Sequence, residues 1–367
     1  MAADHPPVSP PAKPSVEQPV PALPENLTQI LSRAVGTGQE EVISFLCNPQ
    51  VWPHAPASVE ILETHMSLVF FAGDRVYKIK RAIQLKHMDM RSLAARQHFC
   101  RREVELNRLL AADVYLGCAS VTRAPDGTLA IDGEGEAIEP LVVMRRLDTS
   151  QGLDQRILQD RVSAAEIDRL CALLSNFYAR QPPADISGEE FLAIWHEIVG
   201  RVRTSLTDPR FALEKHLVDP PITLLTHFLE THEQMLLDLV DHGRIVDGHG
   251  DLKPEHIVMG DKLLVIDRLE FDDRLRMADP FAEITFLGLE CERLGAPWIG
   301  PRLIDGLAQR LGRRPPDELL RFYRCYQACL RARLSIEHRL DPSPRTPDRW
   351  PRQTRDYLMR ALPSAQP

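Results

Sequence analysis

The segment from His249 to Val258 contains side chains whose types and spacing suit phosphoryl transfer. Its sequence is His-Gly-Asp-Leu-Lys-Pro-Glu-His-Ile-Val, and the apolar run Leu263–Ile266 that follows it ends on Asp267. The pattern places a carboxylate, Asp251, on a tight loop, a possible metal ligand five residues later, and a second carboxylate at a strand end. Transfer of a phosphoryl group from a metal-bound nucleotide needs one carboxylate that orients a hydroxyl nucleophile and further ligands for the metal.

The elements that must position these residues form a strand-rich region followed by a larger helical region. Two β-prone runs flank Gly73-Asp74 and two more flank Asp126-Gly127, which predicts two hairpins. From about Gln151 onward the apolar periodicity is helical, so we expect an α+β chain. The expected strands are 67–72, 75–80, 119–124, 128–131 and 141–144. The expected helices are 27–35, 40–47, 92–110, 163–180, 188–205, 223–241, 280–294, 302–311, 316–338 and 352–361, with Pro182-Pro183, Pro220-Pro221 and Pro315-Pro316 between them.

Composition limits the class of protein. The chain has 367 residues, of which 44% are hydrophobic and 26% are charged, as in a globular protein large enough for two domains. No run of apolar residues is long enough for a membrane span. Residues 1–24 are rich in Pro and are expected to be a disordered tail, without the features of a secretory signal. Seven Cys without a Cys-x-x-Cys pair favour a reducing compartment, and we expect a cytoplasmic protein.

Charge is distributed unevenly along the chain. The net charge of −8 argues against non-specific nucleic-acid binding. Residues 301–367 nevertheless contain 14 Arg, no Lys and 7 acidic residues. These arginines belong either to a solvated helical surface or, in part, to a site that faces an anionic substrate or nucleotide.

The quoted motif resembles a known family. His249-Gly250-Asp251, followed by His256 and Ile266-Asp267, is similar to the catalytic core of the aminoglycoside phosphotransferase-like enzymes, small-molecule kinases of the protein-kinase-like fold. The loop His-Gly-Asp-Leu-x-x-x-His-Ile is typical of a bacterial subgroup. The resemblance covers Val59 to Arg339 and implies a bilobal fold. A nucleotide-binding N-lobe, 25–147, would precede a helical C-lobe, 148–367, that contains the catalytic loop and the metal and acceptor sites.

The resemblance assigns roles to the residues of the motif. Asp251 would orient the acceptor hydroxyl, and His249 would brace the catalytic loop. Asp267 and His256 would hold a divalent metal, Mg²⁺ or Mn²⁺; imidazole is a softer ligand than the Asn that is usual at this position and favours Mn²⁺. Asp279 would cap a helix and support the loop.

Further residues would bind ATP or GTP. Lys78 would hold the donor phosphates and pair with Glu103, although Lys80 lies on the same strand face and is the alternative. Thr64 and Ser67 would donate hydrogen bonds to phosphate in a turn that lacks the usual glycines. By position alone, the adenine-reading hinge would follow Met144.

These expectations favour a phosphotransferase that acts on a hydroxyl group of a small molecule. Only 11 residues separate Asp267 from Asp279, which is short for docking a peptide. The alternatives are a non-catalytic nucleotide-sensing protein of pseudokinase type, and a protein kinase or nucleotidyltransferase on the same fold. No nucleic-acid or membrane partner is expected. The acceptor and the oligomeric state are not specified by the sequence.

Overall fold

The computed structural model describes residues 27–34, 37–85, 88–340 and 348–362. The expected Pro-rich tail, 1–24, lies outside these residues. The chain divides into two compact units. Unit 1 comprises the described residues up to Arg96 together with Ala119–Leu141, and unit 2 comprises Gln97–Cys118 and the described residues from Val142 onward.

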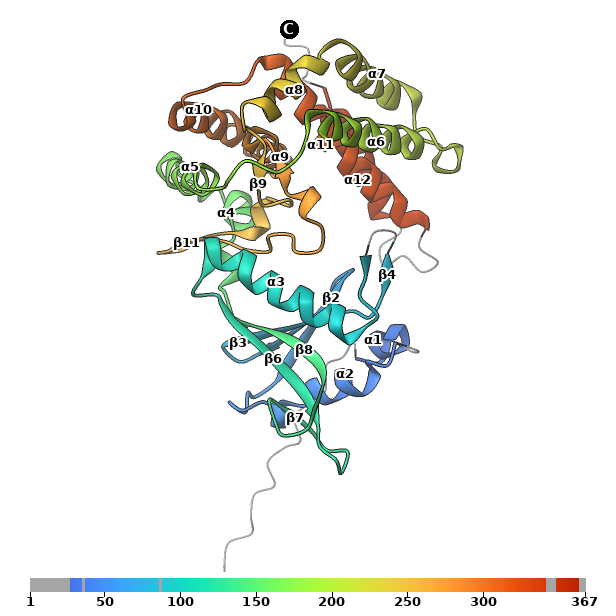
Figure 1. Ribbon diagram of the computed structural model, residues 1–367, viewed down its shortest axis with the longest axis vertical. Coiled ribbons are helices and arrows are strands. Elements are labelled where there is room, and N and C mark those ends of the chain that lie inside the picture. The colour runs from blue at the N-terminus through green and yellow to red at the C-terminus, as the bar shows by residue number, and fades with distance from the viewer. Residues whose placement is uncertain (1–26, 35–36, 86–87, 341–347, 363–367) are drawn as a thin grey trace, which may run out of the picture. The chain divides into compact units, whose positions relative to one another are not determined.

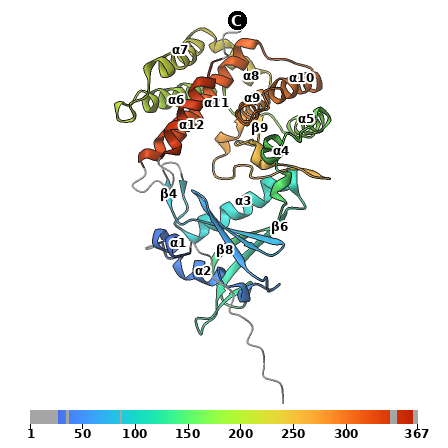
Figure 2. The same ribbon diagram turned by 180° about the vertical axis from the view of Figure 1, so that it is seen from behind.

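Unit 1 is built around a six-stranded sheet, seen from two sides in Figures 1 and 2, with the strand order β1-β2-β3-β8-β6-β7. The strands are β1 (Val59–Glu63), β2 (Ser67–Ala72), β3 (Arg75–Lys80), β6 (Tyr115–Arg123), β7 (Leu129–Ile131) and β8 (Glu136–Arg145). Strands β2 and β3 form the predicted antiparallel hairpin, and Gly73 in its turn adopts a φ of +61° that suits glycine. Strand β1, which pairs with β2, was not predicted.

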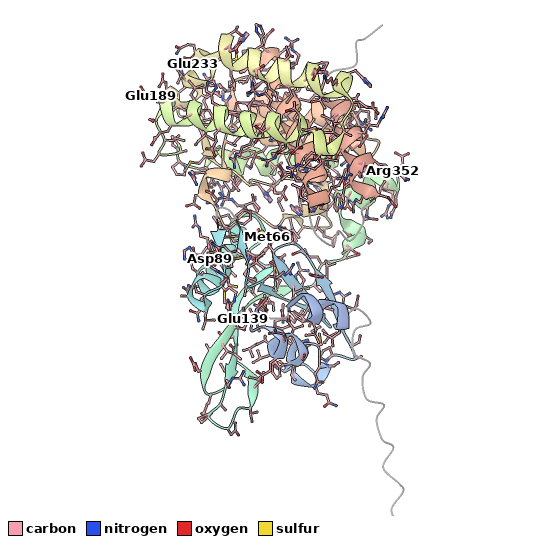
Figure 3. The ribbon with its side chains drawn as sticks, turned by 90° about the vertical axis from the view of Figure 1, so that its right-hand side faces the viewer. Met66, Asp89, Glu139, Glu189, Glu233 and Arg352 are labelled. Atoms are coloured by element: carbon pink, nitrogen blue, oxygen red, sulfur yellow. The ribbon has the colours of Figure 1, made fainter. Side chains whose placement is uncertain are left out.

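The rest of unit 1 consists of short elements and a buried ion pair. The elements are α1 (Leu27–Ala34), α2 (Glu40–Leu46), β4 (Gln84–Leu85) and β5 (Met88–Asp89). Arg96 binds Glu139 through two hydrogen bonds of 2.8 and 2.9 Å, and Glu139 is labelled in Figure 3. Both side chains are buried, and burial raises the pKa of Glu139 although Arg96 opposes the shift. The pair therefore ties the first turns of α3 (Leu93–Ala111) to β8.

Unit 2 is mainly helical, and its helices follow the predicted pattern (Figure 1). Capping boxes begin α5 and α6, at Ser163 and Ser187, as their Ser-x-x-Glu sequences require. Acidic residues in the first turns of α6 and α8, among them Glu189 and Glu233 in Figure 3, suit the positive end of the helix dipole. The helices are α4 (Leu153–Leu158), α5 (Ala164–Ala179), α6 (Gly188–Leu206), α7 (Lys215–Thr231), α8 (Glu233–Asp241), α9 (Pro280–Arg293), α10 (Ile299–Leu311), α11 (Asp317–Glu337) and α12 (Arg349–Arg360).

Three details of the helices differ from the prediction. Helix α4 was not predicted, and the expected helix 223–241 is divided between α7 and α8. Pro220 and Pro221 lie inside α7 instead of ending a loop before it. Proline in a helix removes a backbone hydrogen bond, but α7 also buries Val218, Pro221 and Ile222 in the unit core. Tertiary packing of this apolar face outweighs the local preference.

Two apolar clusters matter for the position of the site. The large core of unit 2 includes Leu252 and Ile257, which follow the His-Gly-Asp motif, and Phe281 and Leu287 of α9. A smaller cluster joins α3 to the strands that follow, through Val104, Tyr115, Val142, Val258 and Leu264. No helix among the described residues has the length and apolarity needed to cross a bilayer.

Candidate active site

Four short strands of unit 2 position the His-Gly-Asp motif. Strand β9 (Val246–Asp247) pairs with β12 (Met277–Ala278), and β10 (Ile257–Met259) pairs with β11 (Leu263–Val265), both antiparallel. The HGD loop, residues 248–256, connects β9 to β10, and the Asp267 loop, residues 266–269, follows β11. Of these four strands only β11 was predicted, as the apolar run Leu263–Ile266; strands of two or three residues have no detectable periodicity.

His249 is a fully buried brace between the two loops. Its Nε2–H donates to the carbonyl oxygen of Ile266 at 2.9 Å, and its Nδ1 accepts from the backbone N–H of Asp251 at 3.3 Å. Burial, reinforced by nearby His256, lowers the pKa of His249 to about 3. The ring is therefore neutral near pH 7 and serves as a fixed hydrogen-bonding group.

Glu283 of α9 holds the backbone of the HGD loop. Its carboxylate accepts hydrogen bonds from the backbone N–H groups of His249, at 2.9 Å, and Gly250, and from the hydroxyl of Tyr178 at 2.8 Å. Burial raises the pKa of Glu283. Gly250 adopts a φ of +87°, and a Cβ here would lie 2.9 Å from a methyl group of Leu269. The loop geometry thus depends on a distant carboxylate and a local glycine.

Two cations flank the carboxylate of Asp251, whose side chain is 24% exposed. The Nζ of Lys253 lies 2.9 Å from its Oδ2 and 3.2 Å from Glu255. A guanidinium nitrogen of Arg331, on α11, lies 3.9 Å from Oδ1. Burial alone would lower the pKa of Lys253, but Asp251 and Glu255 outweigh it and the pKa is raised. Lys253 therefore keeps its positive charge beside Asp251.

His256 and Asp267 lie next to each other at the ends of the two loops. The Nδ1–H of His256 donates to the backbone carbonyl of Asp251 at 2.9 Å. This bond leaves the Nε2 of His256 facing Asp267, whose Oδ2 is 3.5 Å away. Two backbone bonds, from Ile266 N–H to His256 and from Leu269 N–H to His249, join the loops further. The structure thus brings together the two residues that were predicted as metal ligands.

The backbone of Asp267 is unusual and is held from both sides. Its φ is +63°, in the left-handed region that Asp and Asn tolerate better than most residues. The backbone N–H of Asp267 donates to the hydroxyl of Tyr115 at 3.1 Å. The next residue, Arg268, is held by the amide of Asn107, which accepts from its N–H at 2.8 Å. Residues of α3 and β6 therefore fix the direction of the Asp267 loop.

Arg268 also connects this loop to the start of the HGD loop. Its side chain is 1% exposed and donates to the carbonyl oxygens of Gly248, at 2.7 Å, and Asp247, at 2.8 Å. It also forms an ion pair of 2.8 Å with the carboxylate of Asp247. Burial lowers the pKa of Arg268, although Asp247 opposes the shift.

Asp279 begins α9 as an N-cap. Its Oδ1 accepts from the N–H of Phe281, at 3.3 Å, and from Arg313, at 2.8 Å, and its Oδ2 accepts from Tyr323 at 3.2 Å. Burial raises its pKa. The sequence predicted that Asp279 caps this helix and supports the loop. The cap is present, whereas the direct hydrogen bonds to the HGD loop come from Glu283, one turn later.

The residues predicted to bind nucleotide from unit 1 lie on β2, β3 and the turn before β2. Thr64 holds that turn: its hydroxyl donates to the carbonyl of Ser67 at 3.0 Å and accepts from the N–H of Ser67 at 2.9 Å. Thr64 Oγ1 therefore has no hydrogen left to donate to a phosphate, and Ser67 is 2% exposed. On β3, Lys80 is 1% exposed, whereas Lys78 is only partly buried.

Two further nucleotide-binding predictions concern unit 2. Glu103 is fully buried in α3, and its backbone carbonyl accepts from the side chain of Asn107 at 2.9 Å. Met144 lies partly exposed at the edge of the smaller apolar cluster, together with Leu147 and Ile266. All three side chains are partly buried against this cluster, and Ile266 directly precedes Asp267 in the chain.

The site residues that the sequence did not reveal share one property: each is remote from the motif in the chain or looks ordinary there. Glu283 appears as one more helical carboxylate. Asn107, Tyr115 and Arg331 lie more than 60 residues from Asp251. Lys253 and Arg268 are closer to the motif, since they follow Asp251 and Asp267 by two positions and one position, but charged residues are ordinary in loops.

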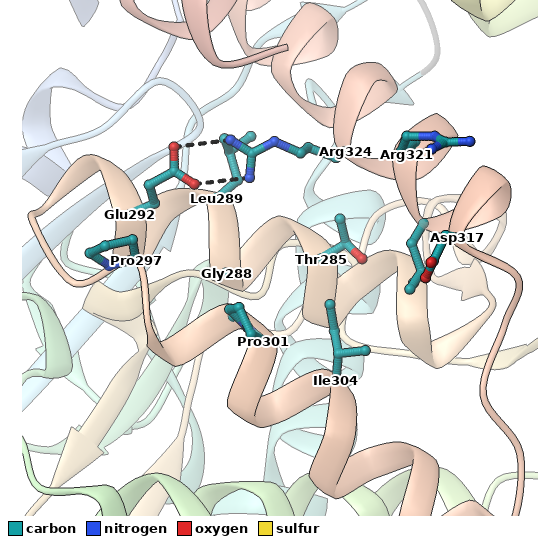
Figure 4. Close-up of a pocket in the computed structure, with 12 residues that line it drawn as sticks. Thr285, Gly288, Leu289, Glu292, Pro297, Pro301, Ile304, Asp317, Arg321 and Arg324 are labelled. Carbon is teal, nitrogen blue, oxygen red and sulfur yellow. Dashed lines mark hydrogen bonds and ion pairs between the residues drawn. The ribbon is translucent and has the colours of Figure 1, made fainter. Parts of the chain in front are cut away.

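The cavity in Figure 4 is separate from this arrangement. It has a volume of about 370 Å³ and lies among α9, α10 and α11, where Glu292 and Arg324 are paired. Thr285 and Glu292 line it from the side of α9 opposite to Glu283, as the helical repeat requires. The Oγ1 of Thr285 is buried without a hydrogen-bond partner among the described residues.

Comparisons with known proteins give relatives and a fold. No protein-family model matches the chain. Uncharacterized proteins of Mycobacterium tuberculosis and Mycobacterium bovis are each 32% identical over 286 residues, 75% of this chain and 54% of theirs. The chain thus spans about half the length of the curated relatives it matches.

Among solved structures, the AMP-bound complex of spectinomycin phosphotransferase aligns with a TM-score of 0.51 and 13% identity, over 84% of this chain and 94% of the other. The GDP complex of aminoglycoside 2'-phosphotransferase-IIIa aligns with a TM-score of 0.47 and 16% identity, over 83% and 92%. The first alignment agrees with the strand-rich unit and the larger helical unit described above. The chain therefore has the protein-kinase-like α+β fold of spectinomycin phosphotransferase, as its resemblance to the aminoglycoside phosphotransferase-like proteins implies.

Proposed function

We propose that the protein is a metal-assisted phosphotransferase that moves the terminal phosphate of ATP or GTP to a hydroxyl group of a small molecule. The observation that carries the proposal is the joining of Asp251 and Asp267 by two buried imidazoles, His249 and His256. One carboxylate then faces the acceptor and the other, with His256, faces the metal. The shared fold supports the proposal, since spectinomycin phosphotransferase carries AMP in its structure.

The donor set suits a divalent metal. The Nε2 of His256 and the Oδ2 of Asp267 are 3.5 Å apart, close to the spacing of neighbouring ligands on one ion. Hydrogen bonding at Nδ1 fixes the tautomer in which Nε2 can bind a metal. No group of three or more His, Cys, Asp or Glu side chains converges among the described residues, so phosphate oxygens and water would complete the shell. When bound, Mg²⁺ or Mn²⁺ neutralises charge on the donor phosphates.

The protein's own groups act by positioning. Asp251 accepts a hydrogen bond from the acceptor hydroxyl and takes its proton as the oxygen attacks. Lys253, 2.9 Å from Asp251, supplies positive charge where the transferred phosphoryl group passes. His249, held neutral, keeps the loop in place and does not exchange protons.

Nucleotide binding is proposed for two groups of residues. Met144, with Leu147 and Ile266, packs against the smaller apolar cluster and would contact a nucleobase. On β3, Lys78 would hold the phosphates, and Lys80, which is 1% exposed, is the alternative. Pairing of Lys78 with Glu103 stays a prediction, and phosphate contacts in the turn fall to backbone N–H groups instead of Thr64.

Amide substitutions test the two carboxylate roles. Asp251→Asn should retain binding of Mn·ATP in calorimetry while ADP formation with any acceptor falls at least 100-fold, because only the acceptor loses its partner. Asp267→Asn should lose metal-dependent nucleotide binding. We choose Asn because it tolerates the left-handed backbone of Asp267.

Two outcomes would contradict the proposal. Turnover of Asp251→Asn at the wild-type rate would remove that residue from the reaction. Metal-dependent nucleotide binding without transfer by the wild-type chain, across a broad panel of hydroxyl acceptors, would favour the nucleotide-sensing alternative. Intact mass spectrometry of the products separates addition of phosphate from addition of a nucleotide.

A further inference from the structure

Arg331 stands out among the arginines of the C-terminal region. Most of the others pair at short range with acidic side chains, for example Arg302 with Asp168 at 2.6 Å and Arg324 with Glu292 at 2.9 Å. Arg331 lies 3.9 Å from Asp251 and 3.9 Å from Glu290, beyond the range of a hydrogen bond to either. The guanidinium is therefore close to two carboxylates without being bound tightly by them.

Both carboxylates have nearer partners. Glu290 accepts hydrogen bonds from Tyr357 and from Arg293, each at 2.7 Å. Asp251 is contacted by Lys253 at 2.9 Å, and Lys253 also lies 3.2 Å from Glu255. Arg331 is therefore not the nearest cation of either carboxylate, and it lies beside Asp251, where an acceptor must approach.

The guanidinium is also held and accessible. Its carbon lies 5.5 Å from the ring centroid of Phe286, a contact that orients the planar group. The side chain of Arg331 is 23% exposed; although burial alone would lower the pKa of its guanidinium, Tyr357 and Asp251 raise it. A planar guanidinium has five N–H groups and can therefore also bind a carboxylate or phosphate through two hydrogen bonds.

We propose that the acceptor is an anionic hydroxy compound, whose carboxylate or phosphate binds Arg331 while Asp251 orients a nearby hydroxyl. The inference rests on the proposed phosphotransfer. Because Arg331 and Asp251 are 3.9 Å apart, the anionic group and the reacting hydroxyl of one small molecule can contact both side chains together. A polycationic acceptor would instead meet two cations, Lys253 and Arg331.

The reaction balances without a further reactant. The hydroxyl oxygen forms a bond to the terminal phosphorus, and the bond from that phosphorus to the bridging oxygen of the nucleoside diphosphate breaks. The hydroxyl proton passes to Asp251 and then to solvent. The product is a phosphate ester that keeps its anionic group next to Arg331.

Matched acceptor pairs test the inference with the full chain, ATP and Mn²⁺ or Mg²⁺. The pairs are glycerate with glycerol, gluconate with sorbitol, and glycerol 3-phosphate with glycerol, and ADP formation is the readout. We expect kcat/KM for at least one anionic member to exceed that of its neutral partner tenfold or more. The carboxylate and phosphate pairs show which anion is preferred.

Variants of Arg331 separate binding from a structural effect. Arg331→Gln should lower the anionic-to-neutral ratio of kcat/KM at least tenfold, mainly through KM, and Arg331→Lys should restore part of it. Arg321→Gln is the matched control, because Arg321 lies on the same helix, is exposed and pairs with Glu318. It should leave the ratio unchanged.

Two results overturn the inference in distinguishable ways. Equal or faster transfer to the neutral members, or an equal loss for both members in Arg331→Gln, would refute the anionic acceptor and leave the proposed phosphotransfer intact. Absence of transfer to every acceptor, although Mn·ATP binds, would refute both.

Discussion

Replacing Glu283 should damage the HGD loop more than any other change outside the loop. Its carboxylate accepts from two backbone N–H groups, those of His249 and Gly250, and from the hydroxyl of Tyr178. A buried donor left without a partner costs about 1–3 kcal/mol. Glu283→Ala strands three such donors, so the expected loss of unfolding free energy is on the order of 5 kcal/mol, a large part of the stability of an ordinary domain.

Glu283→Gln is the sharper change, because the protein should still fold. The amide keeps one oxygen acceptor but turns an NH₂ group toward the second backbone N–H, which leaves one donor without a partner. We expect a loss of about 1–3 kcal/mol in urea unfolding. Small shifts of Asp251 affect orientation strongly, so kcat should fall about tenfold or more while KM for nucleotide changes little.

The control for this experiment lies on the same helix. Glu292→Gln makes the same chemical change on the opposite face of α9, where Glu292 pairs with partly exposed Arg324. Glu292→Gln should lower the unfolding free energy by less than about 1 kcal/mol and leave kcat unchanged. If Glu283→Gln matched Glu292→Gln in both stability and kcat, Glu283 would not support the HGD loop.

Three further predictions concern single side chains. Burial lowers the pKa of His249 to about 3, so its imidazole stays neutral in the folded protein down to that pH. In the unfolded chain the same imidazole binds a proton below about pH 6.5. In the metal-free protein, His249 should therefore lower the unfolding free energy by about 2 kcal/mol between pH 7.5 and pH 5. The prediction would be contradicted if the unfolding free energy of a His249→Asn variant changed with pH as steeply as that of the wild type. Thr285→Val should raise the unfolding free energy by roughly 1 kcal/mol, because it removes a buried hydroxyl that has no hydrogen-bond partner among the described residues; a lower melting temperature would refute it. Lys78→Met should weaken ATP binding in calorimetry at least tenfold, and a larger loss in Lys80→Met would move the phosphate contact to Lys80.

The sequence predicted those parts of the fold that depend on local patterns. The hairpin 67–72/75–80 and the long helices α6 and α11 have clear periodicity, and Asp251, His256 and Asp267 lie within one short segment. The prolines of α7 were misjudged because buried packing overrides local preference. Glu283 could not be recognised, since only the fold brings its carboxylate to the loop 33 residues before it.

The two imidazoles bind backbone oxygens, those of Ile266 and Asp251, so the hydrogen bonds that they make at 2.9 Å do not use the carboxylate of Asp251. The chemistry can therefore be switched off without disturbing the architecture that gathers the reactants. A variant with an amide in place of the Asp251 carboxylate should keep the fold and bind the reactants without transferring phosphate. Asp251→Asn, immobilised and loaded with nucleotide, is accordingly a suitable bait for isolating the natural acceptor from a metabolite extract.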